Sequence, residues 1–584
     1  MKNKLFTSLM LPMIAISMCS CSIFRATVEK SLSVYNLDKY SNSIEACKTG
    51  EVRARFNKNE GYVPYLSLRQ YASLYESHYA DGAVNSISRK DNLVSWSAIK
   101  DNGMYFFTQI DFEKKEVVTA GSLEAVFKAN DDPRDTASLY YGNKTEYDAK
   151  LLGTSVYSHY SFANQEIDYF SYMGDYYLPL SFFDITYSFD ATIYFYYNYN
   201  AIYSTINVDN FYQLEFQRGR DTYTVLSEMN KYRSDSTAPE YLVKLNSNLF
   251  LYLLDNFYGL KEYKGINSGA EYCKSIGTYD KLFSGDGPTR AQAYAETLDR
   301  LDDNHTALVS GSLIWGGQNT TPRQYGTGCL NRSALRGKLN RIRRDNTSEA
   351  YRLTTEYQLS SDGKTAMLFF DEFVYGSTEE VFNDDGSIKE TAKFHDSFYS
   401  LLDFFKEVEA LGTVENVVFD MATNGGGVLG VLMKLLALIS TENKGNLYYL
   451  EAASKQLGIA ITSVDSDNNG AYNKSDCYGD DFNIYLLTSD CSFSCANAFP
   501  CLAQKQGFAK IIGEKSGGGE CAVAIHYLPN GEYVYHSSNL HLGYYDEATE
   551  VFTGFEDGAQ PDILVSDYND FFNINKLSAL IENA

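Results

Sequence analysis

The segment that decides the fold of this chain is Thr488-Ser489-Asp490-Cys491-Ser492-Phe493-Ser494-Cys495-Ala496-Asn497-Ala498-Phe499-Pro500. An apolar run at 484–487, typical of a buried strand, precedes it, and the stretch at 496–504 is typical of a short helix. A hydroxyl residue at such a strand-to-helix turn is exposed, and the helix N-terminus offers free N–H groups to a developing oxyanion. The segment therefore indicates either a nucleophilic serine or an ordinary N-cap serine, which is far commoner.

Strands alternate with helices on both sides of this turn. The predicted order is a strand at Thr365–Asp371, a helix at Thr391–Leu411, a strand at Val414–Met421, a helix from Val428 to about Ser440, and a strand at Lys510–Gly513. Buried apolar strands that alternate with helices indicate an α/β core, which we assign to residues 363–584.

The preceding residues 240–362 are predicted to be mainly helical. Leu245, Leu249 and Leu253 repeat at the i+4 spacing of one helix face. A second helix is expected to begin at Pro288, because proline is favoured in the first helical turn. This helix runs into the polar turn Asp302-Asp303-Asn304-His305-Thr306.

Residues 51–235 have a different composition, dominated by tyrosine and phenylalanine. Short aromatic and β-branched runs separated by Asn, Asp and Gly predict a mainly β region. The stretch at 61–68 resembles the stretch at 176–183, which suggests two related subdomains. The aromatic side chains suit sheet and core packing, with binding of a glycan or peptide as the alternative use.

The overall composition excludes some classes of partner. The chain has 584 residues, 44% of them hydrophobic, so it has enough apolar residues for proper cores. Its formal net charge is −25, which repels nucleic-acid phosphates, and we expect no nucleic-acid partner. The one basic cluster, at 336–344, is interpreted as a solvated helix face.

The N-terminus predicts export. Lys2 and Lys4 precede an apolar run at 5–18 that is too short to span a bilayer comfortably, which together indicates a signal peptide at 1–20. The run ends in Met18-Cys19-Ser20-Cys21, which resembles the lipobox of bacterial lipoproteins with Cys21 as the lipidated residue. We expect a linker at 21–50 and an extracytoplasmic protein held at the cell membrane or surface only by this lipid. Secretion without an anchor is the alternative.

The remaining cysteines and histidines do not form a metal motif. Eight cysteines beyond the signal region are scattered without repeated CxxC pairs, and disulfide pairing among them stays open. His526, His536 and His541 lack the HExxH spacing of a zinc protease and are interpreted as strand residues. The glycines at 425–427 lack both nucleotide-binding fingerprints. We therefore expect no metal and no cofactor.

Taken together, five collinear segments between residues 240 and 584 resemble the tail-specific (C-terminal-processing) serine peptidases, in the branch that includes the tricorn core protease. The segments are Leu301–Thr306, Val417–Gly427, Ser492–Pro500, Ile511–Gly519 and Gly558–Ile563. The resemblance implies a crotonase-like (ββα superhelix) α/β peptidase core, preceded here by the Tyr-rich, mainly β region.

The resemblance also implies roles for individual residues. Aligning the family's Gly-Glu strand with residues 513–514 places the nucleophile on Ser494. The general-base lysine of the Ser-Lys members would fall at Gly519, and Lys515 occupies a different place in the motif. The tricorn-like branch uses a histidine instead, which falls on His305. An imidazole of ordinary pKa suits this role because it takes and returns a proton near neutral pH.

The remaining roles follow from the same resemblance. Backbone N–H groups of Gly425 or Gly426 and of Cys495 are expected to form the oxyanion hole. Glu556 is our choice for the carboxylate that orients His305, with Asp557 as the alternate. The family's serine before the histidine is replaced by Asn304, whose role stays open.

These patterns predict a surface-anchored serine endopeptidase that cleaves proteins or peptides through an acyl-enzyme on Ser494. One alternative is a non-catalytic relative that binds a peptide or apolar ligand, and another is a surface lipoprotein in which the Tyr-rich half carries the function. Too few residues separate Thr306 from Lys364 for a PDZ domain, so tail specificity is not predicted. The oligomeric state stays open.

Overall fold

The computed structural model describes residues 27–38, 47–58, 60–79, 82–127, 145–152, 157–207, 210–213, 215–218, 221–227, 229, 237–311, 323–348 and 356–584. The predicted signal peptide, Cys21 and part of the predicted linker lie outside the described residues. No helix in these ranges is long and apolar enough to cross a membrane. The eight cysteines in these ranges are free thiols.

The C-terminal core is a six-stranded sheet between two layers of helices, as the sequence predicted for an α/β core. Its strands, in spatial order, are β17 (Tyr357–Leu359), β18 (Thr365–Phe369), β19 (Asn416–Asp420), β22 (Asn483–Thr488), β23 (Lys510–Gly513) and β27 (Ile563–Leu564). All neighbours from β18 to β27 pair in parallel, and only β17 is antiparallel to β18. The carboxyl ends of these strands therefore share one edge, where ligand sites of open α/β sheets lie.

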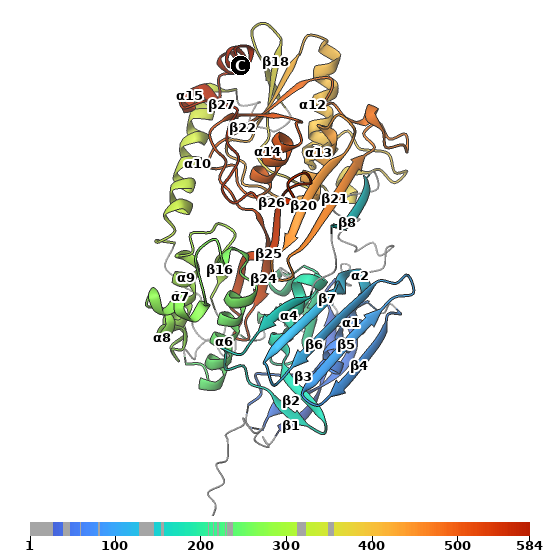
Figure 1. Ribbon diagram of the computed structural model, residues 1–584, viewed down its shortest axis with the longest axis vertical. Coiled ribbons are helices and arrows are strands. Elements are labelled where there is room, and N and C mark those ends of the chain that lie inside the picture. The colour runs from blue at the N-terminus through green and yellow to red at the C-terminus, as the bar shows by residue number, and fades with distance from the viewer. Residues whose placement is uncertain are drawn as a thin grey trace, which may run out of the picture.

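Successive strand residues point to opposite sides of this sheet, and helices cover both sides, so both faces are buried. One face packs with α12 (Ser397–Leu411), α13 (Leu429–Leu438) and α14 (Cys495–Lys505). The other packs with α10 (Thr327–Asn346), α15 (Tyr568–Phe571) and α16 (Ile574–Glu582). In Figure 1, α10 runs along one side of the molecule and joins the lower helices to the core at the top.

A second sheet lies beside the core. Its order is β16 (Ala307–Ser310), β25 (Tyr533–Asp546), β20 (Gly445–Glu451), β21 (Gln456–Val464) and β8 (Thr145–Leu152), and β24 (Cys521–Tyr527) and β26 (Val551–Gly554) also pair with β25. Strand β8 comes from the Tyr-rich region and pairs antiparallel with β21 along its whole length. The Tyr-rich region thus contributes a strand to a sheet of the C-terminal half, which its composition did not indicate.

The N-terminal region is mainly β, as predicted, and contains two larger sheets. One has the order β4 (Val84–Lys90), β5 (Leu93–Ile99), β6 (Tyr105–Asp111), β7 (Glu116–Gly121), β9 (Ser158–Ser161). The other has the order β10 (Phe170–Tyr172), β11 (Asp175–Pro179), β3 (Tyr65–Ser67), β2 (Lys48–Asn57), β1 (Thr27–Asn36), β13 (Ile202–Thr205), β12 (Tyr194–Tyr197). Smaller elements are α2 (Leu123–Phe127), α5 (Asn210–Gln213), β14 (Phe216–Arg218) and β15 (Asp221–Tyr223).

The two similar stretches of the Tyr-rich region form equivalent units of one sheet. Strand β3 leads directly into α1 (Leu68–Tyr79), and β11 leads directly into α4 (Leu180–Ala191). The two strands pair antiparallel, with Leu178 opposite Leu66. The internal similarity is therefore a repeated strand–helix unit, and its two copies lie side by side instead of in two separate subdomains.

One hydrophobic core joins the N-terminal region to the helices that follow it. These helices are α6 (Glu240–Asn256), α7 (Gly269–Ser275), α8 (Tyr279–Leu282) and α9 (Gly287–Asp299). The same core includes Tyr527, Leu528 and Tyr533 at the tip of the β24–β25 hairpin. Most of the aromatic residues of the Tyr-rich region pack here, such as Tyr71 and Tyr75, which are fully buried.

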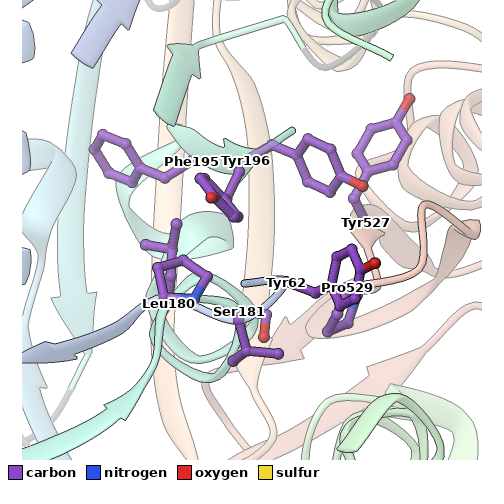
Figure 2. Close-up of a pocket in the computed structure, with 10 residues that line it drawn as sticks. Tyr62, Leu180, Ser181, Phe195, Tyr196, Tyr527 and Pro529 are labelled. Carbon is purple, nitrogen blue, oxygen red and sulfur yellow. The ribbon is translucent and has the colours of Figure 1, made fainter. Parts of the chain in front are cut away.

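Figure 2 shows a pocket at this junction, lined by Leu180 and Phe195 on one side and by Tyr527 and Pro529 of the hairpin on the other. Its volume is about 30 Å³, enough for no more than a few water molecules. The aromatic side chains here thus serve packing, and the pocket has no room for a glycan or peptide.

The basic cluster on α10 is not wholly a solvated face. Arg343 is 2% exposed and forms a paired contact with the Asp420 carboxylate, Nε to Oδ2 at 3.0 Å and Nη2 to Oδ1 at 3.1 Å. Its Nη1 donates to Thr423 Oγ1 at 2.9 Å, and its guanidinium lies 4.2 Å from the Phe369 ring centroid. Arg343 thus fixes α10 to the end of β19, whereas Arg344 beside it is exposed, as predicted.

We predict that Arg343→Ala lowers the free energy of unfolding by about 3–5 kcal/mol, because it leaves the buried Asp420 carboxylate uncompensated. The matched control is Arg344→Ala on the same helix, expected to stay within about 0.5 kcal/mol of wild type. Urea unfolding of the three proteins measures the difference. Equal midpoints for the two variants would contradict a structural role for the buried pair.

Two buried histidines stack on the β24–β25 hairpin. The rings of His526 and His536 lie 5.3 Å apart at an interplanar angle of 17°. Their Nδ1 atoms lie 3.4 Å from Ser188 Oγ of α4 and 3.0 Å from the Ser537 carbonyl, and both Nε2 atoms are buried without a partner in the described residues. Burial lowers the pKa of His526 well below its usual value, and His536 lowers it further. Burial lowers the pKa of His536 to about 4, although the Ser537 carbonyl and the Asp303 carboxylate oppose the shift.

We predict that this pair makes the fold sensitive to acid. Because the folded-state pKa values lie below the unfolded value of 6.5, the unfolded chain takes up protons first as the pH falls. Stability is therefore complete above pH 6.5 and declines below it, by about 2 kcal/mol at pH 5 for His536 alone. Melting temperatures at pH 7.5 and 5.0 should differ less in His536→Gln than in wild type. The exposed control His395→Gln should keep the wild-type difference, and an unchanged difference in His536→Gln would disprove the prediction.

Candidate active site

The turn between β22 and α14 holds Ser494 in an unusual backbone conformation. Its φ is 59° and its ψ is −126°, a region that residues other than glycine rarely adopt. Ser494 occupies the N-cap position of α14, but its side chain makes no capping hydrogen bond. Its backbone N–H donates to the Gly518 carbonyl at 3.0 Å. The ordinary N-cap interpretation therefore does not describe this serine.

The three serines of the turn have different surroundings. Ser489 Oγ donates to the Ala422 carbonyl at 2.6 Å, and Ser492 Oγ donates to the Met421 carbonyl at 2.8 Å; both residues are fully buried. These two hydroxyls bind the turn to the end of β19. Ser494 is partly exposed, and its Oγ forms no hydrogen bond within the described ranges. Of the three, only Ser494 has a hydroxyl free to react.

The glycine turn after β19 lies directly against Ser494. A Cβ at Gly426 would be 2.7 Å from Ser494 Cβ, so only glycine permits this approach. The Gly426 N–H donates to Asn424 Oδ1 at 2.8 Å and is thus already engaged. The N–H groups of Gly425 and Cys495 have no acceptor among the described residues. Of the two glycine donors considered from the sequence, Gly425 is the one left free.

His305 is held by the carboxylate of Asp303. The backbone N–H of His305 donates to Asp303 Oδ1 at 2.9 Å. The other carboxylate oxygen, Asp303 Oδ2, accepts from Thr306 Oγ1 at 2.6 Å and from Ser537 Oγ at 2.8 Å. The imidazole is 8% exposed, and its Nδ1 has no partner in the described part of the chain. Burial lowers the pKa of His305; Asp303 and the Cys521 backbone oppose this shift, and Arg332 adds to it.

Phe493 links the histidine to the serine turn. The rings of His305 and Phe493 meet edge to face at 4.8 Å between centroids, and the Arg332 guanidinium lies 4.9 Å from the Phe493 centroid. Gly519 completes this contact, because a Cβ there would be 2.6 Å from the Phe493 ring. Its φ of +90° also disfavours any side chain. The position that carries lysine in the Ser-Lys members is therefore sterically closed here, and Lys515 is exposed.

The predicted orienting acids lie near this cluster, but within the described residues neither forms a hydrogen bond with His305. Glu556 Oε2 accepts from the N–H groups of Gly519 and Glu520 at 3.1 and 3.0 Å. Burial raises the pKa of Glu556 to about 7, and the nearby Asp303 and Glu520 carboxylates contribute. Asp557 is exposed and accepts from the Tyr263 hydroxyl at 2.8 Å.

Two polar side chains beside these groups were not assigned a role from the sequence. Asn304 Oδ1 accepts from Arg323 Nη1 at 3.4 Å, which supports the turn from outside. Arg332 Nε donates to the Asp490 carbonyl at 2.7 Å, and its Nη2 donates to the Gly517 carbonyl at 2.8 Å. Arg332 therefore ties α10 to both loops that border Ser494. Asp303 could have been found from its place two residues before His305, whereas nothing in the local sequence marks Arg332.

A comparison with protein families finds a match in the C-terminal half of the chain. Residues 387–565 match the model of peptidase family S41. This part of the chain is therefore similar to the S41 peptidases. Its enzyme class is that of a serine-type peptidase, a hydrolase whose substrates are proteins or peptides. The match includes β19, the glycine turn, Ser494 and Glu556, whereas His305 lies upstream of it.

Three solved structures resemble the chain at low identity. Mature CPAF complexed with lactacystin is 13% identical, with a TM-score of 0.37 over 59% of this chain and 97% of that one. The photosystem II D1 C-terminal processing protease is 13% identical, with a TM-score of 0.24 over 35% and 44%. The tricorn protease is 9% identical, with a TM-score of 0.31 over 96% and 58%. A comparison with curated proteins finds no match.

We predict unequal effects on stability for substitutions of Ser492 and Ser494, which are two residues apart. Ser492→Ala should lower the free energy of unfolding by about 1–3 kcal/mol, because it leaves the buried Ser489 N–H unpaired and removes one of the two hydrogen bonds to the Met421 carbonyl, the other coming from the Asn424 N–H. Ser494→Ala should change it by less than about 0.5 kcal/mol, because no hydrogen bond of its Oγ is lost. Thermal unfolding of both variants tests this contrast, and a larger loss in Ser494→Ala would refute it.

Proposed function

We propose that the chain is a serine endopeptidase in which Ser494 is the nucleophile and His305 the general base. The observation that carries this proposal is the Ser494 hydroxyl, which is partly exposed on a strained turn and free of hydrogen bonds in the described residues. Its place within the region that matches the S41 model supports the same role. The two free N–H groups beside it, those of Gly425 and Cys495, can stabilise the oxyanion that forms during acyl transfer.

In the proposed reaction, Ser494 Oγ attacks the carbonyl carbon of the scissile peptide bond while His305 takes the hydroxyl proton. The N–H groups of Gly425 and Cys495 stabilise the oxyanion that forms. Protonated His305 then gives its proton to the leaving amine, and the C–N bond breaks to leave an acyl-enzyme. A water molecule, deprotonated by His305, hydrolyses the ester and restores Ser494.

Two features support His305 over a lysine as the base. The position for a lysine is closed by the Phe493 ring and by the backbone conformation of Gly519. Burial favours the neutral imidazole, which is the form that accepts a proton. We propose Asp303 as the carboxylate that holds the turn of His305 in place, and Glu556 remains the candidate for direct orientation of the imidazole during the reaction.

The finer sequence predictions belong to the same proposal. We propose that the core has the crotonase-like superhelical arrangement, which the parallel sheet and its two helix layers suit. We also propose that the protein is exported and lipid-anchored at Cys21, because a charged start, an apolar run and a lipobox-like end succeed one another at residues 2–21. The peptidase domain would then act outside the cytoplasm.

A fluorophosphonate probe tests the proposed catalytic residues, because it labels only a serine activated as a nucleophile. We expect wild type to be labelled on Ser494 and to cleave casein. Ser494→Ala should abolish both, and His305→Ala should slow both by roughly 10²-fold or more. Lys515→Ala is the matched control for the other basic candidate and should behave as wild type.

Each departure from this pattern has a defined meaning. Labelling that persists in Ser494→Ala, or wild type that neither labels nor cleaves, would reject the endopeptidase and favour the ligand-binding alternative. Normal rates in His305→Ala would leave Ser494 as nucleophile and reject His305 as its base. Circular dichroism of the variants shows whether a loss of activity reflects a loss of fold.

A further inference from the structure

Strands β24 and β25 bring together three side chains that have no part in the proposed peptidase mechanism. Glu520 immediately precedes β24, Cys521 is its first residue, and His541 lies opposite Cys521 in the β25 register. His541 Nδ1 is 2.6 Å from Glu520 Oε1. Cys521 Sγ is 3.8 Å from His541 Nδ1 and 3.9 Å from its Nε2. One donor atom from each residue lies within 4.8 Å of the other two.

This donor set suits zinc. Carboxylate oxygen, imidazole nitrogen and thiolate sulfur are the three kinds of ligand that bind Zn²⁺ in proteins. Tetrahedral bonds of about 2.3 Å to sulfur and about 2.0 Å to nitrogen separate these two atoms by roughly 3.5 Å. The sulfur–nitrogen distances of 3.8 and 3.9 Å are close to this spacing. Glu520 Oε1 and His541 Nδ1, at 2.6 Å, are closer than the roughly 3.3 Å that separates oxygen and nitrogen ligands of a tetrahedral ion, so their hydrogen bond must open and the imidazole must turn to admit zinc.

The surroundings of the cluster favour a cation. The carboxylates of Glu520, Glu556 and Asp303 all lie close enough to act electrostatically on the Cys521 thiol. The Glu556 N–H holds the second oxygen of Glu520, Oε2, at 2.9 Å and so leaves Oε1 directed to His541. A divalent ion between the three donors would offset this concentration of negative charge.

The cluster is enclosed but reachable. Cys521 is 2% exposed, whereas the side chains of Glu520 and His541 retain 10% and 15% of their accessible surface. Cys521 is a free thiol, so it is available to a metal. Gly259 packs against the buried side of the cluster, where a Cβ would be 3.2 Å from Cys521 Sγ.

We propose that Glu520 Oε1, Cys521 Sγ and His541 Nδ1 form a zinc-binding site with a fourth position open to water. The site ties the beginning of β24 to the middle of β25. It lies one residue from Gly519, which contacts Phe493, so a bound ion would fix the segment that borders the nucleophile turn. The binding itself does not depend on the proposed peptidase activity.

Zinc binding is measured on the purified full chain by equilibrium dialysis against Zn²⁺ followed by metal analysis, and by absorption spectra with Co²⁺ in place of Zn²⁺. We expect about one zinc per chain, and a cobalt complex with a near-ultraviolet thiolate-to-metal charge-transfer band. Cys521→Ser and His541→Gln should weaken binding by roughly tenfold or more. Cys521→Ser should also abolish the charge-transfer band, because that band requires a sulfur ligand.

Two variants serve as matched controls. Cys47→Ser removes a partly exposed thiol elsewhere, and Asp467→Asn alters a cluster at Asp465, Asp467 and Asp476 that offers oxygen donors only. Both should bind zinc as wild type does. Absence of micromolar zinc binding by wild type, zinc retention by Cys521→Ser, or loss of zinc in Asp467→Asn would each overturn the proposal. Circular dichroism confirms that the variants are folded.

Discussion

The candidate active site depends on the close approach of two turns at the carboxyl ends of neighbouring parallel strands. The turn after β19 can lie against the turn after β22 only because Gly426 has no side chain, since a Cβ would be 2.7 Å from that of Ser494. Hydroxyls of Ser489 and Ser492 bind the second turn to carbonyls of the first. These bonds offset the strained conformation of Ser494. In the described part of the chain, the Ser494 hydroxyl itself forms no hydrogen bond that holds the turn.

The β24–β25 hairpin extends this arrangement to the rest of the molecule. Its tip packs in the aromatic core of the N-terminal region, and the stacked pair His526 and His536 lies next to the tip. Further along β25, Ser537 binds Asp303, the carboxylate that holds His305. Because one hairpin contacts both the N-terminal core and the histidine turn, the Tyr-rich region supports the position of His305 through packing, whatever else it binds.

Much of the α/β core could be predicted because its signals are local. The apolar strands at 365–371 and 414–421, the proline at the start of α9 and the glycine turn each determine structure within a few residues. Ser494 and His305 were chosen as candidates because each lies in a short pattern that resembles one family, and their catalytic roles stay predictions. Their positions therefore needed no knowledge of the tertiary structure.

The contacts that sequence did not reveal are long-range pairings. Arg343 and Asp420 are 77 residues apart, and the basic cluster around Arg343 is typical of an exposed face. Strand β8 lies in a region of Tyr-rich composition but pairs with β21 of the peptidase half. Glu520 and Cys521 meet His541 only through hairpin register, which no spacing motif encodes. In each case the topology of the fold determines the partner, and local propensity does not predict it.

The closed position at Gly519 connects these observations to the chemistry. With φ at +90° and the Phe493 ring in the space of a Cβ, this residue cannot carry a base. The same ring contacts His305 on one side and the Arg332 guanidinium on the other. Phe493 thus excludes a lysine while it positions the imidazole, and Arg332 holds the loops on which that ring rests. The proposed replacement of a lysine base by His305 thus involves Phe493, Gly519 and Arg332 together.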